Sequence, residues 1–390
     1  MFRLETRLFS GVGSTNELIN EFTRRGFTKV LVLIDKAVSD NSEYWLQIRE
    51  TLTSNFQVQI TEIELHGEPT YDFLDSVVSE IRELQGVDVL IGIGGGSILD
   101  IAKAVAVLIT NPGCAIEYRG FDKVLKAGVP CVCIPTTAGT GSEVTINAVF
   151  TDSAEMKKLG INGNYMAATY AVLDAKFTES CPFDVALSSG LDALVHTLES
   201  FSAKQSTPIT RMLSLDAFRL IYNSLETALN NPEDEESRQQ LLLGSYFAGA
   251  ALFNSGSGIS GALSYPIGVH FRVPHGFAGG ITLPSIIKFN IERGWFGYSQ
   301  LLDAVEFNPN MSSAAKSALF HSRIIELYTR IKAPSTFDRW KITLGDLDSL
   351  NDNCKGLQAA FDQNPVSFSA TSDVPIILKQ HIGNQKVGVN

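Results

Sequence analysis

The chain has 390 residues, of which 44% are hydrophobic and 19% charged, and its formal net charge is −11. This length and balance predict a globular protein of two domains with a sizeable core. The acidic charge argues against a nucleic-acid partner, which needs a basic face. The N-terminal residues lack the apolar region of a signal peptide, and no run of apolar residues is long enough for a membrane helix. We therefore expect a cytoplasmic protein with no membrane partner.

The five cysteines are odd in number and scattered along the chain. Cys131 and Cys133 stand two apart on a predicted strand, so both side chains face one side of it. Their spacing is not that of a CxxC motif. We interpret all five as buried, reduced thiols, as expected in the cytoplasm.

The first half of the chain alternates between strand and helix signals. Apolar, β-branched runs predict strands at 29–35, 87–93 and 129–134. Helical periodicity predicts helices at 71–84 and 97–109. This alternation is typical of a Rossmann-like α/β domain, a parallel sheet with helices on its faces.

After about residue 178 the periodicity becomes helical, with predicted helices at 185–201, 210–229 and 237–252. We therefore predict an α/β domain over 1–178 and an all-α domain over 179–390. Asn231-Pro232, followed by acidic residues, predicts a helix start with Asn231 as its cap. The stretch 364–390 lacks periodicity and predicts a flexible or extended tail.

A glycine-rich turn lies between the strand 87–93 and the helix that follows it. Gly94, Gly95 and Gly96 let backbone N–H groups approach a phosphate, and the helix N-terminus favours an anion. The turn is not a GxGxxG fingerprint, because Ser97 stands where the third glycine would be. A purely structural tight turn is the alternative.

A second loop follows the strand 129–134 and is rich in hydroxyls, which Thr136, Thr137, Thr140 and Ser142 supply. Hydroxyls at the carboxyl ends of parallel strands commonly hold a nucleotide. Two such loops after neighbouring strands predict a dinucleotide site.

Asp35 ends the strand 29–35, where a carboxylate can accept hydrogen bonds from an adenosine ribose. The same carboxylate would repel a 2′-phosphate, so it favours NAD over NADP. The alternative is that Asp35 is only a helix cap or turn residue.

A carboxylate and an imidazole share one face of the predicted helix 185–201. Asp192 and His196 are four residues apart among apolar neighbours, so they need a polar partner. A divalent iron or zinc ion would supply one, and a simple Asp–His hydrogen bond is the alternative. His275, in a Val-Pro-His-Gly turn, adds a third candidate ligand, and His270 lies five residues before it.

Four segments, GGGSILDIAKA, PTTAGTGSEVT, GLDALVHTLES and VPHGFAGGITLP, together resemble the iron-containing (group III) alcohol dehydrogenases. That family shares its fold with dehydroquinate synthase, and the similarity runs from about Gly11 to Leu302. The resemblance implies an NAD- and metal-dependent dehydrogenase that transfers a hydride between a primary alcohol and its aldehyde. We expect a homodimer.

The resemblance also implies roles for individual residues. Those implied to hold the pyrophosphate are Gly94, Gly95, Gly96, Ser97 and Asp100. Those implied to line the adenine and nicotinamide side are Thr136, Thr137, Thr140 and Ser142, with Lys158 as a further cofactor contact. The implied metal ligands are Asp192, His196 and His275.

The sequence departs from the family at two histidine positions, which Gly261 and Tyr265 occupy. One metal ligand is therefore missing, and water, substrate oxygens or His270 could replace it, or metal binding could be weak. Glycine at position 261 predicts open volume beside the metal. Tyr265 is expected to act as a hydrogen-bond donor or proton relay, with His270 as a second catalytic candidate.

The stretch GALSYPIGVHFRVPHG resembles a subgroup that oxidises C8 of 3-deoxy-D-manno-octulosonate, a sugar acid of lipopolysaccharide. A widened pocket would suit this polyol, and Arg272 either pairs with its carboxylate or is a surface residue. Two alternatives remain open. One is a dehydroquinate synthase-like cyclase, which needs a cluster of basic residues of which the helical half shows few, and the other is a metal-free, non-catalytic NAD-binding protein.

Overall fold

A computed structural model describes residues 2–84, 86–155 and 157–383. The chain forms two compact units, one holding residues 3–186 and 231–246 and the other holding the rest. The first unit is built on parallel β-structure and the second on helices, so the predicted fold class is confirmed. The domain boundary at residue 178 stays a prediction.

The first unit is organised around a parallel sheet with the strand order β1-β9-β6-β4-β2-β3. Its strands are β1 (Arg7–Ser10), β2 (Lys29–Asp35), β3 (Gln57–Ile63), β4 (Val89–Gly94), β6 (Cys131–Pro135) and β9 (Tyr170–Leu173). The three strands predicted from apolar runs are β2, β4 and β6, which are neighbours. Because these strands are parallel, the segments that follow them lie at the same edge of the sheet.

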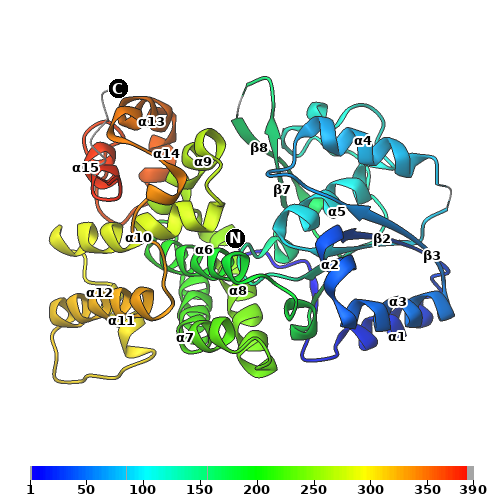
Figure 1. Ribbon diagram of the computed structural model, residues 1–390, viewed down its shortest axis with the longest axis horizontal. Helices are drawn as coiled ribbons and strands as arrows, with labels where there is room; N and C mark the ends of the chain where they lie inside the picture. The colour runs from blue at the N-terminus through cyan, green and yellow to red at the C-terminus, as the bar shows by residue number, and fades with distance from the viewer. Residues whose placement is uncertain (1, 85, 156, 384–390) are drawn as a thin grey trace. The chain divides into compact units, whose positions relative to one another are not determined.

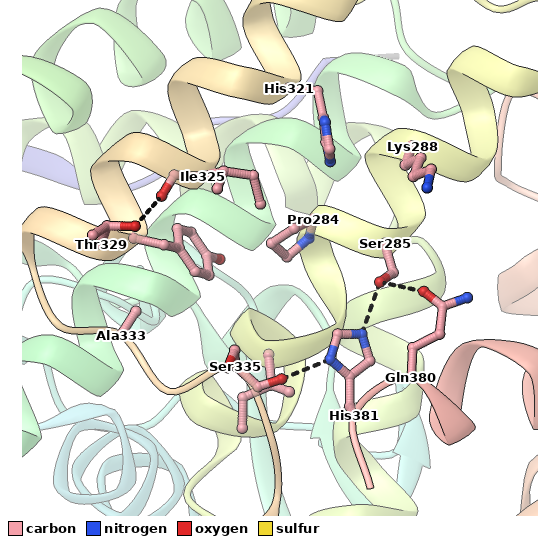
Figure 2. Close-up of a pocket in the computed structure, with 12 residues that line it drawn as sticks. Pro284, Ser285, Lys288, His321, Ile325, Thr329, Ala333, Ser335, Gln380 and His381 are labelled. Carbon is pink, nitrogen blue, oxygen red and sulfur yellow. Dashed lines mark hydrogen bonds between the residues drawn. The ribbon is translucent and has the colours of Figure 1, made fainter. Parts of the chain in front are cut away.

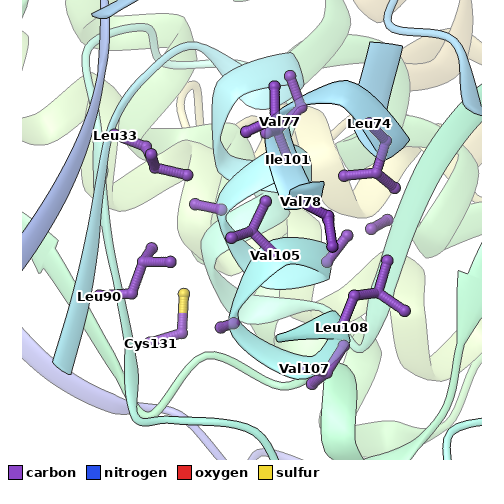
Figure 3. Packing of buried hydrophobic residues seen from close by; sticks show 14 of the residues in the cluster. Leu33, Leu74, Val77, Val78, Leu90, Ile101, Val105, Val107, Leu108 and Cys131 are labelled. Carbon is purple, nitrogen blue, oxygen red and sulfur yellow. The ribbon is translucent and has the colours of Figure 1, made fainter. Parts of the chain in front are cut away.

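Helices cover both faces of this sheet (Figure 1). They are α1 (Thr15–Arg25), α2 (Lys36–Asn41), α3 (Glu43–Asn55), α4 (Tyr71–Arg82) and α5 (Gly96–Leu108). On one face, α4 and α5 bury Leu74, Val78 and Val105 against Leu33 and Leu90 (Figure 3). On the other face, apolar side chains of α1 and α3 pack on the alternate residues of the same strands. Burial on both faces explains why the central strands read as continuous apolar runs.

A small second sheet in the order β5-β8-β7 was not predicted from the sequence. It consists of β5 (Gly120–Phe121), β7 (Asn147–Asp152) and β8 (Lys157–Asn162). Its pairing of β7 with β8 is antiparallel, and β7 packs against α5. Two of its strands, β7 and β8, are formed by the segment that follows the hydroxyl-rich loop.

Helices form the second unit, and the first part of α8 belongs to the α/β unit. The three helices predicted from periodicity are present as α6, α7 and α8. The helices after residue 182 are α6 (Phe183–Ser202), α7 (Pro208–Asn230), α8 (Glu235–Ser255), α9 (Ile259–Phe271), α10 (His275–Glu292), α11 (Tyr298–Asp303), α12 (Ser313–Arg330), α13 (Leu347–Cys354), α14 (Gln358–Phe361) and α15 (Val374–Lys379). Among the described helices, none is long and apolar enough to cross a membrane.

Helix α8 begins at Glu235, so the predicted start at Asn231-Pro232 is wrong. Residues 231–234 form a turn, in which the Asp234 N–H donates to the carbonyl of Asn231 at 3.0 Å. The Asp234 carboxylate then accepts from the N–H of Ser237 at 2.8 Å. Asp234, and not Asn231, therefore caps α8, because its carboxylate accepts from an N–H group of the first helical turn.

The stretch after residue 364 is docked on the second unit up to residue 383, so the predicted flexible tail is wrong over that range. It contains α15, and His381 is buried. Burial lowers the pKa of His381. The Nδ1–H of its neutral ring donates to the carbonyl of Ser335 at 2.8 Å, and Ser285 of α10 lies 2.8 Å from Nε2 (Figure 2). Residues 384–390 lie outside the described residues.

All five cysteines are free thiols, but the prediction that all are buried is wrong. Cys131, Cys133 and Cys354 are buried, whereas Cys114 is exposed and Cys181 is half-buried. Both exceptions lie in connecting segments, Cys114 just before a short 3-10 turn and Cys181 just before α6.

The first turn of α10 lies against the backbone of α6. A Cβ atom at Gly276 would stand 1.8 Å from the carbonyl oxygen of Ser188, and one at Gly280 would stand 2.9 Å from the Cβ of Leu191. Only glycine permits this approach at position 276. The contact fixes His275, the residue before Gly276, beside α6.

We predict that Gly276→Ala destabilises the protein by about 1–3 kcal/mol or more, because the new methyl group forces the two helices apart. Urea unfolding of the metal-free protein measures this change. The matched control is Gly356→Ala, where a Cβ meets no atom within 4 Å, and we expect its stability to stay within about 0.5 kcal/mol of wild type. Equal stabilities of the two variants would contradict the close packing of α10 on α6.

Candidate active site

The glycine turn and the hydroxyl-rich loop are in contact at the end of β4 and β6. A Cβ at Gly96 would stand 2.6 Å from Thr140, and one at Gly95 would stand 3.5 Å from the hydroxyl of Thr137. Gly95 is the N-cap of α5 and has no side chain to bond the first N–H groups of that helix. These N–H groups and hydroxyls suit the phosphates of a dinucleotide, because a helix N-terminus favours an anion.

A buried lysine of α5 donates hydrogen bonds to the backbone of the hydroxyl-rich loop and of β7. Lys103 of α5 is 1% exposed, and its Nζ donates to the carbonyl of Ser142 at 2.8 Å and to the carbonyl of Asn147. It also lies 3.1 Å from Oδ1 of Asp100. This buried cation is partnered on several sides, as burial of a charge requires.

Asp100, predicted to hold the pyrophosphate, and Ser142, predicted to line the adenine and nicotinamide side, are engaged with the protein itself. The Ser142 hydroxyl donates to Asp100 at 2.5 Å, and the other carboxylate oxygen of Asp100 accepts from the N–H of Val149 at 2.9 Å. Lys158 of β8 forms an ion pair with Glu68 at 2.7 Å. These contacts hold the loop and β7 together, and the cofactor roles of the three residues stay predictions.

Asp35 caps a helix, which was the alternative left open for it. Its Oδ1 accepts from the N–H of Ala37 at 2.9 Å at the start of α2. Because β2 is the neighbour of β4, Asp35 ends at the same edge of the sheet as the glycine turn. A carboxylate has further acceptor positions for a ribose, so its role in coenzyme choice stays a prediction.

Glu143 is a buried acid within the hydroxyl-rich loop. It is 2% exposed and belongs to the short 3-10 turn Ser142–Val144. Burial raises the pKa of Glu143 to about 7, against the opposing attraction of Lys103. The loop therefore changes its charge near neutral pH.

The three predicted metal ligands come together in the second unit. Asp192 and His196 lie on α6, and His275 is the first residue of α10. One ligand atom from each lies within 4.8 Å of the others. Nε2 of His196 and Nε2 of His275 are 3.4 Å and 3.9 Å from Oδ1 of Asp192. Two imidazoles and one carboxylate are a donor set suited to iron or zinc.

The burial of this group also fits a metal ion. Asp192 and His196 are buried, and His275 is partly exposed. The Nδ1 of His196 is buried and has no hydrogen-bond partner among the described residues. The protein therefore leaves one ring nitrogen of this imidazole unused, while the other, Nε2, lies 3.4 Å from Asp192.

Helix α9 supplies two side chains that contact His275. The Ser264 hydroxyl lies 2.9 Å from Nδ1 and 3.1 Å from Nε2 of His275. The ring of Tyr265 meets the imidazole edge to face, with centroids 5.2 Å apart. Tyr265 is thus brought to the ligand group, as its predicted catalytic role requires, and that role itself stays a prediction.

The predicted open volume at Gly261 is wrong. A Cβ at this position would stand 2.6 Å from the hydroxyl of Ser257 and 2.8 Å from Oε2 of Glu199. The Glu199 carboxylate accepts from the N–H groups of Gly258 at 2.7 Å and Gly261 at 3.0 Å. Glycine is needed here because a buried carboxylate fills the space beside it.

His270 and Arg272 lie at the exposed end of α9. His270 is exposed and does not belong to the ligand group found among the described residues. Arg272 is exposed and ends the helix in the left-handed conformation. Their predicted roles toward substrate stay predictions that these positions do not support.

Comparison with known families gives the class of the protein. Residues 5–175 match the family described as iron-containing alcohol dehydrogenase, and residues 186–382 match the C-terminal domain of the Fe-containing alcohol dehydrogenase family. The chain therefore belongs to the iron-containing alcohol dehydrogenase family, and it is an oxidoreductase.

Individual relatives agree with this assignment. The chain is 33% identical to a sulfoacetaldehyde reductase of Bilophila wadsworthia, with 69% of each chain covered. It is 32% identical to an NAD-dependent methanol dehydrogenase of Bacillus methanolicus, over 68% of this chain and 69% of that one. A solved 1,3-propanediol oxidoreductase has the same fold, with a TM-score of 0.90 at 22% identity, covering 98% of this chain and all of that one.

Three residues of these sites were not found from the sequence. Lys103 lies within an apolar helix, and its single charge was the available signal. Glu199 follows Asp192 by seven residues and so shares its helix face, which was a second usable signal. Ser264 gave no signal, because its partner His275 is remote in sequence and only the packing of α9 on α10 joins them.

We predict that Glu143→Gln changes how stability depends on pH. The folded-state pKa of about 7 lies above the ordinary glutamate value of 4.5, so the folded protein keeps a proton that the unfolded chain loses. Wild type therefore loses stability as pH rises from about 4.5 to about 7, by up to about 3 kcal/mol, and the neutral glutamine does not.

Urea unfolding at a series of pH values tests this prediction. The stability of Glu143→Gln relative to wild type should rise with pH across that window and level off above it. The exposed Glu50→Gln is the control, and its difference from wild type should stay flat. A flat difference for Glu143→Gln would show that the buried acid does not titrate there.

Proposed function

We propose that this NAD-dependent alcohol dehydrogenase, whose cofactors are NAD and a divalent metal ion, interconverts a primary alcohol and its aldehyde through the residues described above. The observation that carries the proposal is the group of Asp192, His196 and His275, in which three metal-ligand atoms from two helices converge. The ion would be held by these three side chains. The pyrophosphate of NAD would be held by the glycine turn and the hydroxyl-rich loop.

A metal ion bound there would supply Lewis-acid polarisation of the substrate oxygen, and NAD would accept or return the hydride. Asp192 brings one negative charge to the site and so favours a divalent cation over a neutral ligand. Tyr265, beside His275, is placed to donate a hydrogen bond to the substrate oxygen or to carry its proton. The backbone N–H groups at the start of α5 orient the coenzyme through its phosphates.

The substrate is a small alcohol or aldehyde. The two relatives named above act on sulfoacetaldehyde and methanol by their names, and we extend only this size class to the chain. The C8 hydroxyl of 3-deoxy-D-manno-octulosonate stays a prediction that rests on the resemblance of residues 261–276. The filled space beside Gly261 removes the argument that a wide pocket favours a polyol. A homodimeric, cytoplasmic enzyme likewise stays a prediction.

The two alternative functions differ from this proposal in measurable ways. A cyclase of the dehydroquinate synthase kind finds no support, because the matching family models are those of alcohol dehydrogenases. A metal-free, non-catalytic NAD-binding protein would bind the coenzyme, take up no stoichiometric metal and form no NADH with any alcohol.

We predict that Asp192→Asn and His275→Ala each lose bound metal and lower the rate of NADH formation by ~10³-fold or more, since Lewis-acid catalysis contributes several kcal/mol. NAD binding should persist, because its loops belong to the other unit. Metal analysis and a panel of alcohols, including the sugar acid and a small diol, measure both effects. The control is His321→Ala, outside the ligand group. Full metal content in both variants would show that the site lies elsewhere.

We predict that Asp35 sets the preference for NAD. Asp35→Asn keeps an oxygen to cap α2 but removes the charge, so the ratio of NAD to NADP efficiency should fall by about ten-fold or more. Asp35→Gly should relax the preference as well, and it also loses the cap. Steady-state kinetics with both coenzymes measure the ratio. Equal use of NADP by the wild type would refute the assignment.

A further inference from the structure

A short relay of hydrogen bonds joins Glu199 of α6 to His275 of α10 through the first turns of α9. Glu199 is 5% exposed, and its two oxygens accept from the N–H groups of Gly258 and Gly261 at 2.7 Å and 3.0 Å. The carbonyl of Gly261 accepts from the Ser264 hydroxyl at 2.5 Å. The Ser264 oxygen then lies 2.9 Å from Nδ1 of His275.

Glu199 replaces the missing cap of α9. The N-cap residue, Gly258, has no side chain, so the first N–H groups of this buried helix need another acceptor. A carboxylate at a helix N-terminus is also favoured by the helix dipole. Because Glu199 extends from α6, on the same face as Asp192 and His196, it fixes the start of α9 to the helix that carries two of the ligands.

The relay also supplies a hydrogen-bond acceptor for the ring of His275. The Ser264 hydroxyl has one proton, which it donates to the carbonyl of Gly261. Its oxygen can then only accept from the imidazole, whose Nδ1 and Nε2 lie 2.9 Å and 3.1 Å from it. Nε2 also lies 3.9 Å from Oδ1 of Asp192, so an ion bound to Nε2 would leave the proton on Nδ1, where it donates to Ser264. Hydrogen bonds of this kind orient metal-bound histidines and fix their tautomers.

We propose that Glu199 and Ser264 are positioning residues for the metal site, which act together to hold the ring of His275 beside Asp192 and to accept its Nδ1–H when Nε2 binds the ion. The proposal rests on the proposed metal site and adds to it the residues that prepare one of its ligands. Neither residue is proposed as a ligand, because the Glu199 oxygens are occupied by three donors of residues 257–261.

The test compares Ser264→Ala, Glu199→Gln and the double variant with wild type. Glutamine keeps the size of Glu199 but turns an amide group toward one of two N–H donors, so one cap hydrogen bond is lost. The matched control is Ser260→Ala. Ser260 is a fully buried serine of the same helix turn, and its hydroxyl has no partner among the described residues.

The measurement is the Zn²⁺ dissociation constant of each metal-free protein, by competition with a chromophoric chelator, together with the visible spectrum of its Co²⁺ form. We expect each single variant to bind Zn²⁺ ~10–100-fold more weakly, the range found for such outer partners. Because both residues act through one relay, the double variant should bind Zn²⁺ no more weakly than the single variant with the lower affinity. The Co²⁺ spectra of both single variants should shift in the same direction, and Ser260→Ala should match wild type.

Several results would overturn the proposal. Zn²⁺ affinity of Ser264→Ala within three-fold of wild type would do so, even if Glu199→Gln failed to fold. Losses that multiply in the double variant would show two independent effects, and lowered thermal stability with unchanged Zn²⁺ affinity would show a structural role alone. If wild type takes up no Zn²⁺, or if His275→Ala binds it as tightly as wild type, the proposed metal site itself fails.

Discussion

Helix α10 starts against the backbone of α6, where position 276 has no side chain, and the group of Asp192, His196 and His275 depends on this contact. It places His275 beside Asp192 and His196, which α6 alone could not bring to a third ligand. The glycines one turn further along continue the approach and let α9 pack on α10. The polar group of Asp192, His196 and His275 can therefore form in the apolar helical core only because the backbones of α6 and α10 lie in close contact.

In the α/β unit, a buried charged side chain, and not a glycine, holds two segments together. The loop after β6 carries carbonyl groups that point into the protein, where water does not reach them. Lys103 donates to the carbonyls of Ser142 and Asn147 and pairs with Asp100. Asp100 in turn accepts from the N–H of Val149. Two charged residues of α5, Lys103 and Asp100, therefore hold the hydroxyl-rich loop in place.

Sequence periodicity was enough to predict the elements that are buried on defined faces. Strand β2 has the predicted bounds of residues 29–35, and α6 differs from its prediction by two residues at the start and one at the end. The convergence of Asp192, His196 and His275 was also predictable, because Asp192 and His196 share a helix face and His275 stands in a recognisable turn.

What the sequence did not show depends on contacts between remote residues. The glycine at position 261 predicted an opening, whereas the side chain that fills the space comes from α6, at Glu199. The segment after residue 364 shows no long periodicity because its helix, α15, has only six residues. The segment nevertheless buries Val374 and Leu378, and His381 bonds Ser335. Local patterns carry no information about which distant partner meets a glycine or a lone histidine.

The ligand group joins two helices that are separated by α7, α8 and α9 along the chain. An ion bound to Asp192, His196 and His275 would act as a removable cross-link that closes a long loop of the helical unit. Its effect on unfolding then depends on the free metal concentration, and reaches about 2.7 kcal/mol at one hundred times the dissociation constant. The resistance of this unit to unfolding is therefore partly a property of its surroundings, and chelation would act on it as a denaturant does.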